Sequence, residues 1–397
     1  MSTSDLLLLG IVLFVLIDFS AGMVINYLNE RSKNQPLSAE GAEIFNPDEY
    51  AKSMAYGTDK YRFEMLTTLI STVAILTAII VGAFAWLDAQ LRDRLSNNLL
   101  ITVIFIAILI AFSTIANLPS AYYSTFVIEE KFGFNKSTRK LFILDKLKGW
   151  LMLAILGGAI LALVIWFFEW AGANFWMYAW AVIAVFSLAM NLFYSKLIVP
   201  LFNKQKPLEE GSLKTKIEHY AKKVGFELHN IFVIDGSKRS TKANAYFSGF
   251  GKEKRVTLYD TLINDLEEDE IVAVLAHEVG HYKRKHIIFN LISSILLTGF
   301  TLYLLSLFIN TPAVSLAIGV SVPSFHAALI GFGILYSPIS EITGLIMNYM
   351  SRKFEYEADD YAKNTFNAKT LISSLKKLSK NRLSNLTPHQ AYVFMHY

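Results

Sequence analysis

The residues best suited to chemistry are His277, Glu278 and His281, which form the pattern His-Glu-x-x-His. The surrounding run, at about 267–285, is predicted to be helical, with acidic residues in its first turn and basic residues in its last. Helix positions four apart lie about 400° around the axis, so both histidines point the same way and can bind one ion. Glu278 lies about 100° away, where it can act as general base for a water molecule. The pattern therefore predicts a zinc hydrolase site rather than two solvated helix histidines.

A catalytic zinc ion needs a third protein ligand and one open position. The chain contains no cysteine, so that ligand must be His, Asp or Glu. His286 is a weak candidate, because it lies nine residues past His277, about 180° around the same helix, and is expected to face away. A better source is an acidic cluster, which consists of Glu355, Glu357, Asp359 and Asp360.

Glu355 and Asp359 are four apart in this cluster and share one helix face. One of them can bind the metal while the other hydrogen-bonds a ligand histidine. The alternative is a solvated acidic face, and spacing alone does not choose the ligand.

Composition places these residues in a membrane protein. The 397-residue chain is 53% hydrophobic and 18% charged, whereas soluble proteins average about 25% charged residues. We predict a mainly α-helical, multi-pass membrane protein with seven spans, each long enough to cross a bilayer. The spans are Leu6–Tyr27, 65–87, 99–124, 149–171, 175–202, 287–309 and 325–349.

The distribution of lysine and arginine predicts the orientation of these spans. The loop at 28–64 contains five basic residues and the loop at 125–148 contains six, whereas two follow span two and none separates spans four and five or six and seven. Basic loops remain in the cytosol. We therefore expect the N-terminus outside, and the soluble segment 203–286 on the cytosolic side.

Four regions follow from this pattern. Residues 1–202 are expected to hold spans one to five, and 203–286 a soluble metallopeptidase segment ending in the His-Glu-x-x-His helix. Residues 287–350 hold spans six and seven, and 351–397 form a C-terminal helical segment that carries the acidic cluster.

The soluble segment also contains three strand-like runs, spaced for a small antiparallel sheet. These runs are Asn230–Asp235, Ala243–Phe250 and Arg255–Tyr259. A helix, a small α+β sheet and then the metal helix is the layout expected of a zinc peptidase.

The motifs together resemble those of the type I CAAX prenyl proteases, which are integral-membrane zinc metalloproteases of the gluzincin type. The His-Glu-x-x-His pattern is followed about seventy residues later by Ser-Arg-x-x-Glu-Tyr-x-Ala-Asp at 351–359. Matching stretches occur at 130–138 and 244–247. The similarity covers nearly the whole chain, including the number of spans.

This resemblance implies specific roles. Glu355 is expected to be the third zinc ligand, and Asp359 to hydrogen-bond a ligand histidine. Asn244 and Ala245 are expected to lie on an edge strand that pairs with the substrate backbone. The family also encloses a water-filled chamber within its seven helices. Several polar residues occur in or near the predicted spans. A charge that faced lipid would cost about 2.5–3.5 kcal/mol, so their presence agrees with an aqueous interior. They include Asp18, Asn117, Asn191, Lys196, Asn290, Glu341 and Asn348.

The predicted function is that of a zinc endopeptidase with one Zn²⁺ per chain. The resemblance implies removal of the C-terminal tripeptide of a prenylated protein. We expect the lipid bilayer to be a prokaryotic inner membrane or that of the endoplasmic reticulum. We expect no nucleic-acid partner. A general quality-control peptidase is the alternative if the membrane is a prokaryotic inner membrane. A non-enzymatic alternative is a seven-span transporter or lipid-binding protein with an incidental metal site.

Relatives continue past the last residues of this chain with a Ser-His-Pro segment, whose histidine is a candidate stabiliser of the tetrahedral intermediate. The chain ends at Tyr397. Either the chain is truncated there, or that role belongs to another donor, such as His389, His396 or a tyrosine.

Overall fold

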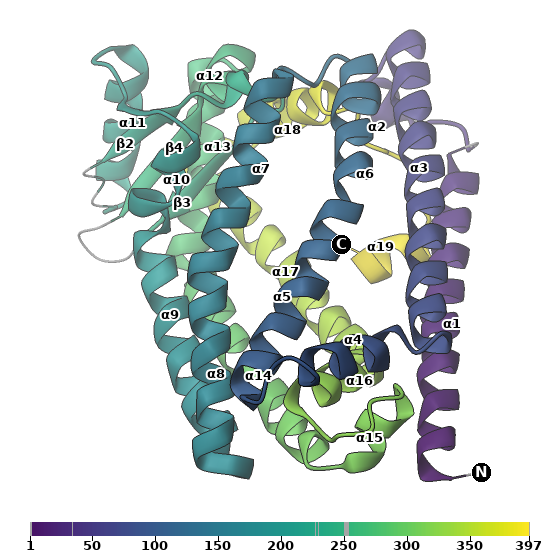
Figure 1. The fold of residues 1–397 in the computed structure, drawn as a ribbon. Coiled ribbons are helices and arrows are strands. Elements are labelled where there is room, and N and C mark those ends of the chain that lie inside the picture. The colour runs from purple at the N-terminus through teal and green to yellow at the C-terminus, as the bar shows by residue number, and fades with distance from the viewer. Residues whose placement is uncertain (1, 34, 227, 229, 250–253, 397) are drawn as a thin grey trace.

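Long apolar helices form most of the structure, a computed structural model that describes residues 2–33, 35–226, 228, 230–249 and 254–396 (Figure 1). Within these residues, five helices are long and apolar enough to cross a membrane, or six if one bent pair counts as a single span. The five are α1 (Thr3–Ser32), α3 (Pro47–Ile80), Asn98–Glu129, Arg139–Phe202 and α14 (His286–Ile309). The bent pair is α16 (Phe325–Leu335) and α17 (Ser337–Thr365), which meet at 55°.

Two of these long stretches are divided into shorter helices. The first comprises α5 (Asn98–Ala116), α6 (Leu118–Tyr123) and η1 (Ser124–Glu129). The second comprises α7 (Arg139–Met152), η2 (Leu153–Gly157), α8 (Gly158–Ala171), η3 (Gly172–Asn174), α9 (Phe175–Leu197) and α10 (Val199–Phe202). Because α8 and α9 meet at η3 and pack side by side (Figure 1), this stretch turns back on itself.

The predicted span at 65–87 is wrong at its C-terminal end. Helix α3 stops at Ile80, and Gly82 has a φ of 68°, which the α-helix does not allow. A separate helix, α4 (Ala83–Arg92), follows and buries Asp88 against the bundle. The remaining short helices are α2 (Ala39–Ala42), α11 (Ser212–Lys223), η4 (Gly236–Lys238), α12 (Asp260–Asp265), α15 (Pro312–Ala317), α18 (Ala368–Asn381) and α19 (Gln390–His396).

A four-stranded sheet covers the end of the bundle opposite the N-terminus (Figure 1). Its strands are β1 (Gln205–Pro207), β2 (Ile231–Ile234), β3 (Ala245–Ser248) and β4 (Arg255–Tyr259), in the order β1-β2-β4-β3. The predicted antiparallel sheet is therefore corrected, because β2 and β4 are parallel. After β2 the chain passes the position of β4 and forms β3 at the edge of the sheet. It then reverses to form β4, which lies between β3 and β2 and is antiparallel to β3. Residues 250–253, between β3 and β4, lie outside the described residues.

The metal helix is α13 (Glu268–Lys283), close to its predicted bounds. Glu267 and Glu270 form a capping box at its start, and such caps stabilise a helix by about 1 kcal/mol. It ends where Lys285 adopts a left-handed φ of 64°, and α14 begins at the next residue. The metal helix and the sixth predicted span are therefore two helices with different axes.

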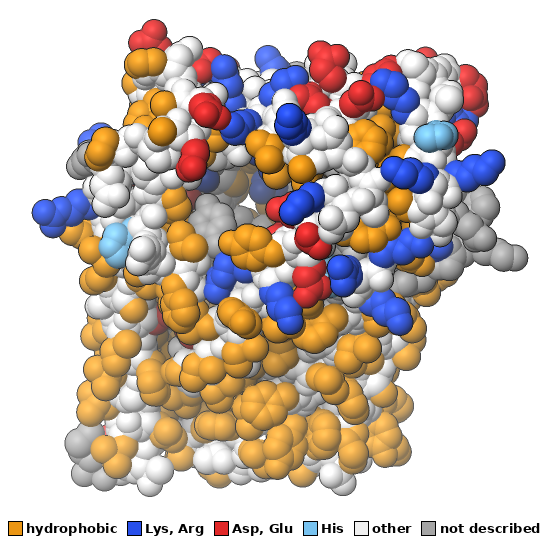
Figure 2. Space-filling model, turned by 180° about the vertical axis from the view of Figure 1, so that it is seen from behind, with side chains coloured by type: hydrophobic (Ala, Val, Ile, Leu, Met, Phe, Trp, Pro, Cys, Tyr) orange, Lys and Arg blue, Asp and Glu red, His pale blue; other side chains and the backbone are white. Residues whose placement is uncertain are grey.

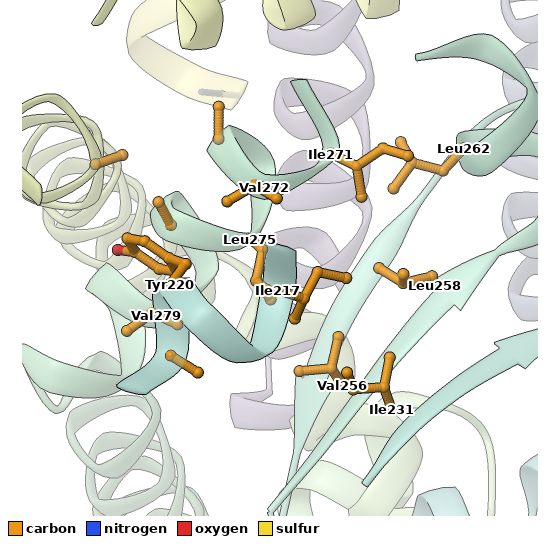
Figure 3. Packing of buried hydrophobic residues seen from close by; sticks show 14 of the residues in the cluster. Ile217, Tyr220, Ile231, Val256, Leu258, Leu262, Ile271, Val272, Leu275 and Val279 are labelled. Carbon is orange, nitrogen blue, oxygen red and sulfur yellow. The ribbon is translucent and has the colours of Figure 1, made fainter. Parts of the chain in front are cut away.

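Helix α13 is buried against the sheet, α11 and α18 (Figure 3). Figure 3 shows Val279 of this helix beside Tyr220, Leu275 beside Ile217 and Ile271 beside Leu262. These residues form one buried cluster with Val256 and Leu258 of β4, and each of them is at most 2% exposed. Burying one such side chain contributes about 1.5–3 kcal/mol. This core fixes the helix that carries the histidines.

The outer surface separates into two zones. Figure 2 shows hydrophobic side chains covering the part of the molecule away from the sheet, and charged side chains gathered at the sheet end. Large apolar residues such as Phe112, Val185 and Ile342 are at least 60% exposed. An apolar belt of this extent is typical of a surface in contact with lipid, and it places the sheet end outside the hydrocarbon.

Candidate metal centre

The metal centre lies where α13 crosses α17, and a glycine allows the two backbones to approach. A Cβ atom added to Gly280 would lie 3.0 Å from both the Cα and the carbonyl oxygen of Ala358. That separation is tighter than ordinary van der Waals contact, and the atoms that would have to move are backbone. Gly280 therefore sets the distance between the helix that carries His277 and His281 and the helix that carries Glu355.

Three side-chain atoms converge at this crossing. Nε2 of His277 lies 3.1 Å from Nε2 of His281 and 3.3 Å from Oε2 of Glu355, and Nε2 of His281 lies 3.6 Å from Oε1 of Glu355. These residues form the one group among the described residues that could hold a metal ion. Tetrahedral zinc, with bonds of about 2.0–2.2 Å, holds its ligand atoms about 3.3 Å apart. Two imidazole nitrogens and a carboxylate at this spacing fit zinc.

Asp359 lies behind His277, one helical turn from Glu355. Its Oδ1 is 2.7 Å from Nδ1 of His277, so Nδ1 carries the hydrogen, and Nε2 of the neutral ring is free to bind a metal. Burial lowers the pKa of His277, but the hydrogen bonds to Asp359 and Glu355 outweigh it and raise the pKa to about 9. The carboxylates around the His277 ring therefore stabilise positive charge there, whether a proton or a metal ion carries it.

Glu278 is largely buried beside the two histidines. Burial raises the pKa of its carboxyl group, although His277 and His281 act in the opposite direction. A carboxylate with a raised pKa is a stronger base than an exposed one. Such an environment suits a general base.

His286 does not face away from the site, as its sequence position predicted. The left-handed turn at Lys285 ends α13 and changes the direction of the chain. Nδ1 of His286 lies 3.0 Å from Nδ1 of His281, and its Nε2 lies 3.1 Å from Oε2 of Glu357. An angle of 180° between His277 and His286 requires one continuous helix, which the chain does not form here. The basic run at 283–285, directly before an apolar span, was the sequence signal for a junction.

Ala245 is the first residue of the edge strand β3, which pairs with β4 on one side, and Asn244 directly precedes this strand. The amide nitrogen of Tyr259 donates to the carbonyl of Asn244, so the backbone of Ala245 and Phe247 is directed to the other, unpaired edge. The Ala245 N–H is meanwhile 3.0 Å from the side-chain oxygen of Asn244.

A cavity of about 840 Å³ lies between this edge and α9, and Asn244, Phe247 and Asn191 are among its walls. His277, His281 and Glu355 are not among the described residues that line it. Strand β3 also packs against α13, the helix that carries both histidines.

Comparison with known proteins assigns the family. Residues 26–204 match the family model for the CAAX prenyl protease N-terminal region, described as five membrane helices, and residues 207–396 match peptidase family M48. The chain is 36% identical to CAAX prenyl protease 1 homolog of Arabidopsis thaliana over 89% of this chain and 85% of that protein. The chain belongs to the CAAX prenyl protease family. The homologue from Homo sapiens is 31% identical over 90% of this chain and 85% of that protein.

The family fold extends over the whole chain. The crystal structure of S. mikatae Ste24p has a TM-score of 0.93 and 32% identity to this chain, and the match covers 98% and 96% of the two. This member of the CAAX prenyl protease family is therefore a multi-pass membrane metallopeptidase. Peptidase family M48 is a zinc metallopeptidase family, in agreement with the His-His-Glu group.

The C-terminal histidines of this family member contact other parts of the chain. His389 is fixed by the Ala391 amide, which donates to its Nδ1 across 3.1 Å. His396 ends α19, a helix that packs against α1 and α17. Among the described residues, neither histidine hydrogen-bonds or stacks with His277, His281 or Glu355, and Tyr397 lies outside the described residues.

Proposed function

We propose that the chain binds one zinc ion through His277, His281 and Glu355 and hydrolyses a peptide bond near the C-terminus of a prenylated protein. The observation that carries this proposal is the spacing of 3.1, 3.3 and 3.6 Å between the three ligand atoms. Zinc at this position would polarise the scissile carbonyl and lower the pKa of a water molecule towards about 7.

The residues of the chain then carry the protons and hold the ligands. Glu278 takes a proton from the attacking water as the new C–O bond forms, and gives it to the amine as the C–N bond breaks. Asp359 keeps His277 in the tautomer whose Nε2 faces the metal. The burial that raises the Glu278 pKa suits both transfers.

The free edge of β3 is the proposed binding site for the substrate backbone. The N–H and C=O groups of Ala245 and Phe247 face this edge, and an extended peptide can add there as a further strand. The Asn244 side chain, which now accepts from the Ala245 N–H, would rotate to bind the substrate instead. Alternate residues of the peptide would then face the cavity beside α9.

Seven spans around a water-filled chamber are also part of the proposal. Counting α8 and α9 separately and the bent pair α16 and α17 as one gives seven. Asn191, in the middle of a predicted span, lines the 840 Å³ cavity. A second cavity of about 330 Å³, between α1, α3 and the chain before α19, is lined by charged residues that include Lys33 and Lys242. Polar cavities at these positions support an aqueous interior.

The proposed orientation places the catalytic region in the cytosol. Both basic loops contact the sheet end of the molecule. Asp145 of the loop at 125–148 pairs with Arg239 at 2.7 Å, and the Tyr56 hydroxyl of the loop at 28–64 accepts from Lys242 at 3.0 Å. The less basic loop after α3 lies at the end that carries the N-terminus (Figure 1). The positive-inside rule then puts the metal centre in the cytosol.

The substrate class is tested with two peptides of the same C-terminal sequence, one farnesylated on its cysteine and one unmodified. Purified protein in lipid should release the tripeptide from the farnesylated peptide faster, because the prenyl chain binds among the apolar helices. Mass spectrometry identifies the released fragment. Equal rates for both peptides would indicate a peptidase without prenyl recognition and contradict the substrate proposal.

A further inference from the structure

His286 is the buried histidine nearest to the proposed zinc ligands, and the mechanism does not use it. It is the first residue of α14 and is 2% exposed. Its ring stacks on Phe354 with centroids 4.1 Å apart and an interplanar angle of 13°. Phe354 directly precedes Glu355, so this stack attaches the start of α14 to the turn of α17 that holds the third ligand.

The hydrogen bonds around His286 connect it to His281 on one side and to Glu357 on the other. Nε2 of His286 faces the Glu357 carboxylate at 3.1 Å, and since a carboxylate only accepts, this nitrogen carries the hydrogen. Nδ1 of a neutral His286 is then bare and accepts from Nδ1 of His281 across 3.0 Å. With its hydrogen on Nδ1, His281 has a free electron pair on Nε2, the atom that faces His277 and Glu355.

We propose, on the basis of the zinc function above, that His286 and Glu357 position His281 for metal binding. His286 fixes the tautomer and the ring orientation of His281 through Nδ1, and Glu357 fixes the tautomer of His286. His277 has a carboxylate as its direct partner in Asp359, whereas His281 reaches its carboxylate through a second imidazole. A carboxylate thus orients His277, whereas an imidazole orients His281.

The expected effect is a loss of zinc affinity. Removing an outer partner of a metal-ligating histidine typically costs 10–100-fold in metal affinity. His286→Phe keeps a ring that can stack on Phe354 but removes both nitrogens, so we expect a loss of about this size. His286→Asn places an oxygen near the position of Nδ1, where it accepts from His281, and it should recover most of the affinity. Glu357→Leu should cost less than His286→Phe.

The chain offers a matched control in His326. It is also fully buried and hydrogen-bonded to a carboxylate, at 2.9 Å from Asp88, and its ring packs 4.3 Å from Phe105. His326→Phe removes a comparable interaction from α16, close to α4 and away from α13. It should lower the melting temperature and leave zinc affinity unchanged.

The test is a chelator-competition titration of zinc on purified wild-type protein and on each variant, with melting temperatures measured on the same samples. The inference predicts weak binding for His286→Phe, recovery in His286→Asn and wild-type binding for His326→Phe. Wild-type affinity in a folded His286→Phe, or no recovery in His286→Asn, would overturn it. If His286→Phe does not fold, the same comparison is made with Glu357→Leu, and wild-type affinity there also overturns it.

Failure of this inference is distinguishable from failure of the proposed function. Wild-type protein that binds zinc and cleaves peptide, with variants that bind zinc equally well, contradicts the role of His286 alone. Wild-type protein that binds no zinc contradicts the proposed function as well.

Discussion

Two histidine–carboxylate clusters at opposite ends of the bundle use the same residue types and leave their histidines in different states. At the end of α4 and α16, both ring nitrogens of His326 have partners, Asp88 at 2.9 Å and Thr102 at 3.1 Å, and Arg92 pairs with Asp88 at 2.8 Å. At the metal centre, each of His277 and His281 has one partnered nitrogen and directs the other at a shared point.

Structural and functional histidines differ in how many of their ring nitrogens are already hydrogen-bonded. A buried polar group whose every hydrogen bond is made contributes to folding and has nothing left to offer a ligand. Two imidazole electron pairs 3.1 Å apart, beside a carboxylate, are favourable when a cation lies between them. Substitutions at the first cluster should therefore change stability, and substitutions at the second should change zinc binding.

The largest expected effect comes from Glu355→Ala, which removes one of the three proposed ligands. Zinc should no longer co-purify, and cleavage should fall below detection, because losing a ligand costs more than the 10–100-fold typical of an outer partner. Metal analysis of the purified protein measures this. Full zinc stoichiometry in the variant would exclude Glu355 as a ligand.

Next in size is Glu278→Gln. The amide cannot accept a proton from water, so the cleavage rate should fall about 10²–10⁴-fold, while zinc content stays at the wild-type level. Rates with saturating peptide, measured beside metal analysis, separate these two effects. A variant with normal activity, or one that has lost zinc, contradicts the assignment of Glu278 as general base.

A smaller effect is expected from Asp359→Asn. The amide can still accept from Nδ1 of His277 but lacks the charge, so zinc affinity should fall by about tenfold, at the low end of the range for outer partners. Asp88→Asn is the matched substitution at the other cluster and should lower the melting temperature without changing zinc affinity. If Asp359→Asn and Asp88→Asn bind zinc with the same affinity, Asp359 has no role in metal binding that Asp88 lacks, and the contrast between the two clusters is wrong.

The smallest expected effect is that of Gly280→Ala. The added methyl group would meet the backbone of Ala358 at 3.0 Å, and overpacking of this kind costs about 1–3 kcal/mol. We expect a lower melting temperature together with weaker zinc binding, because α13 and α17 move apart. Gly333→Ala is the matched control, since a Cβ there meets no atom within 4 Å.

The identity of the residues at the metal centre is easier to predict from the sequence than the way in which α13 and α17 cross. The placement of His277 and His281 depends on helical periodicity alone, and the structure has the helix that this periodicity requires. The choice of Glu355 came from family resemblance, because a four-residue spacing places Asp359 on the same helix face. Local pattern could not rank two carboxylates whose roles depend on how α17 crosses α13.

Features that depend on a change of chain direction were missed. Lys285 adopts a left-handed conformation that is uncommon for a residue other than glycine, and this one residue brings His286 to the site. Strand β1 is three residues long and ends in a proline, too short for alternation to be detected. The parallel pairing of β2 with β4 follows from a crossover at 235–244 that no local pattern predicts.

The metal dependence of cleavage is the most direct test of the proposed zinc function. Purified protein in lipid would be stripped with a chelator, titrated with zinc, and assayed at each point for release of the C-terminal tripeptide from a farnesylated peptide. We predict that activity returns in proportion to bound zinc and reaches its maximum at one ion per chain, while Glu278→Gln binds the same amount and stays inactive. Full cleavage by the metal-free protein would contradict the account.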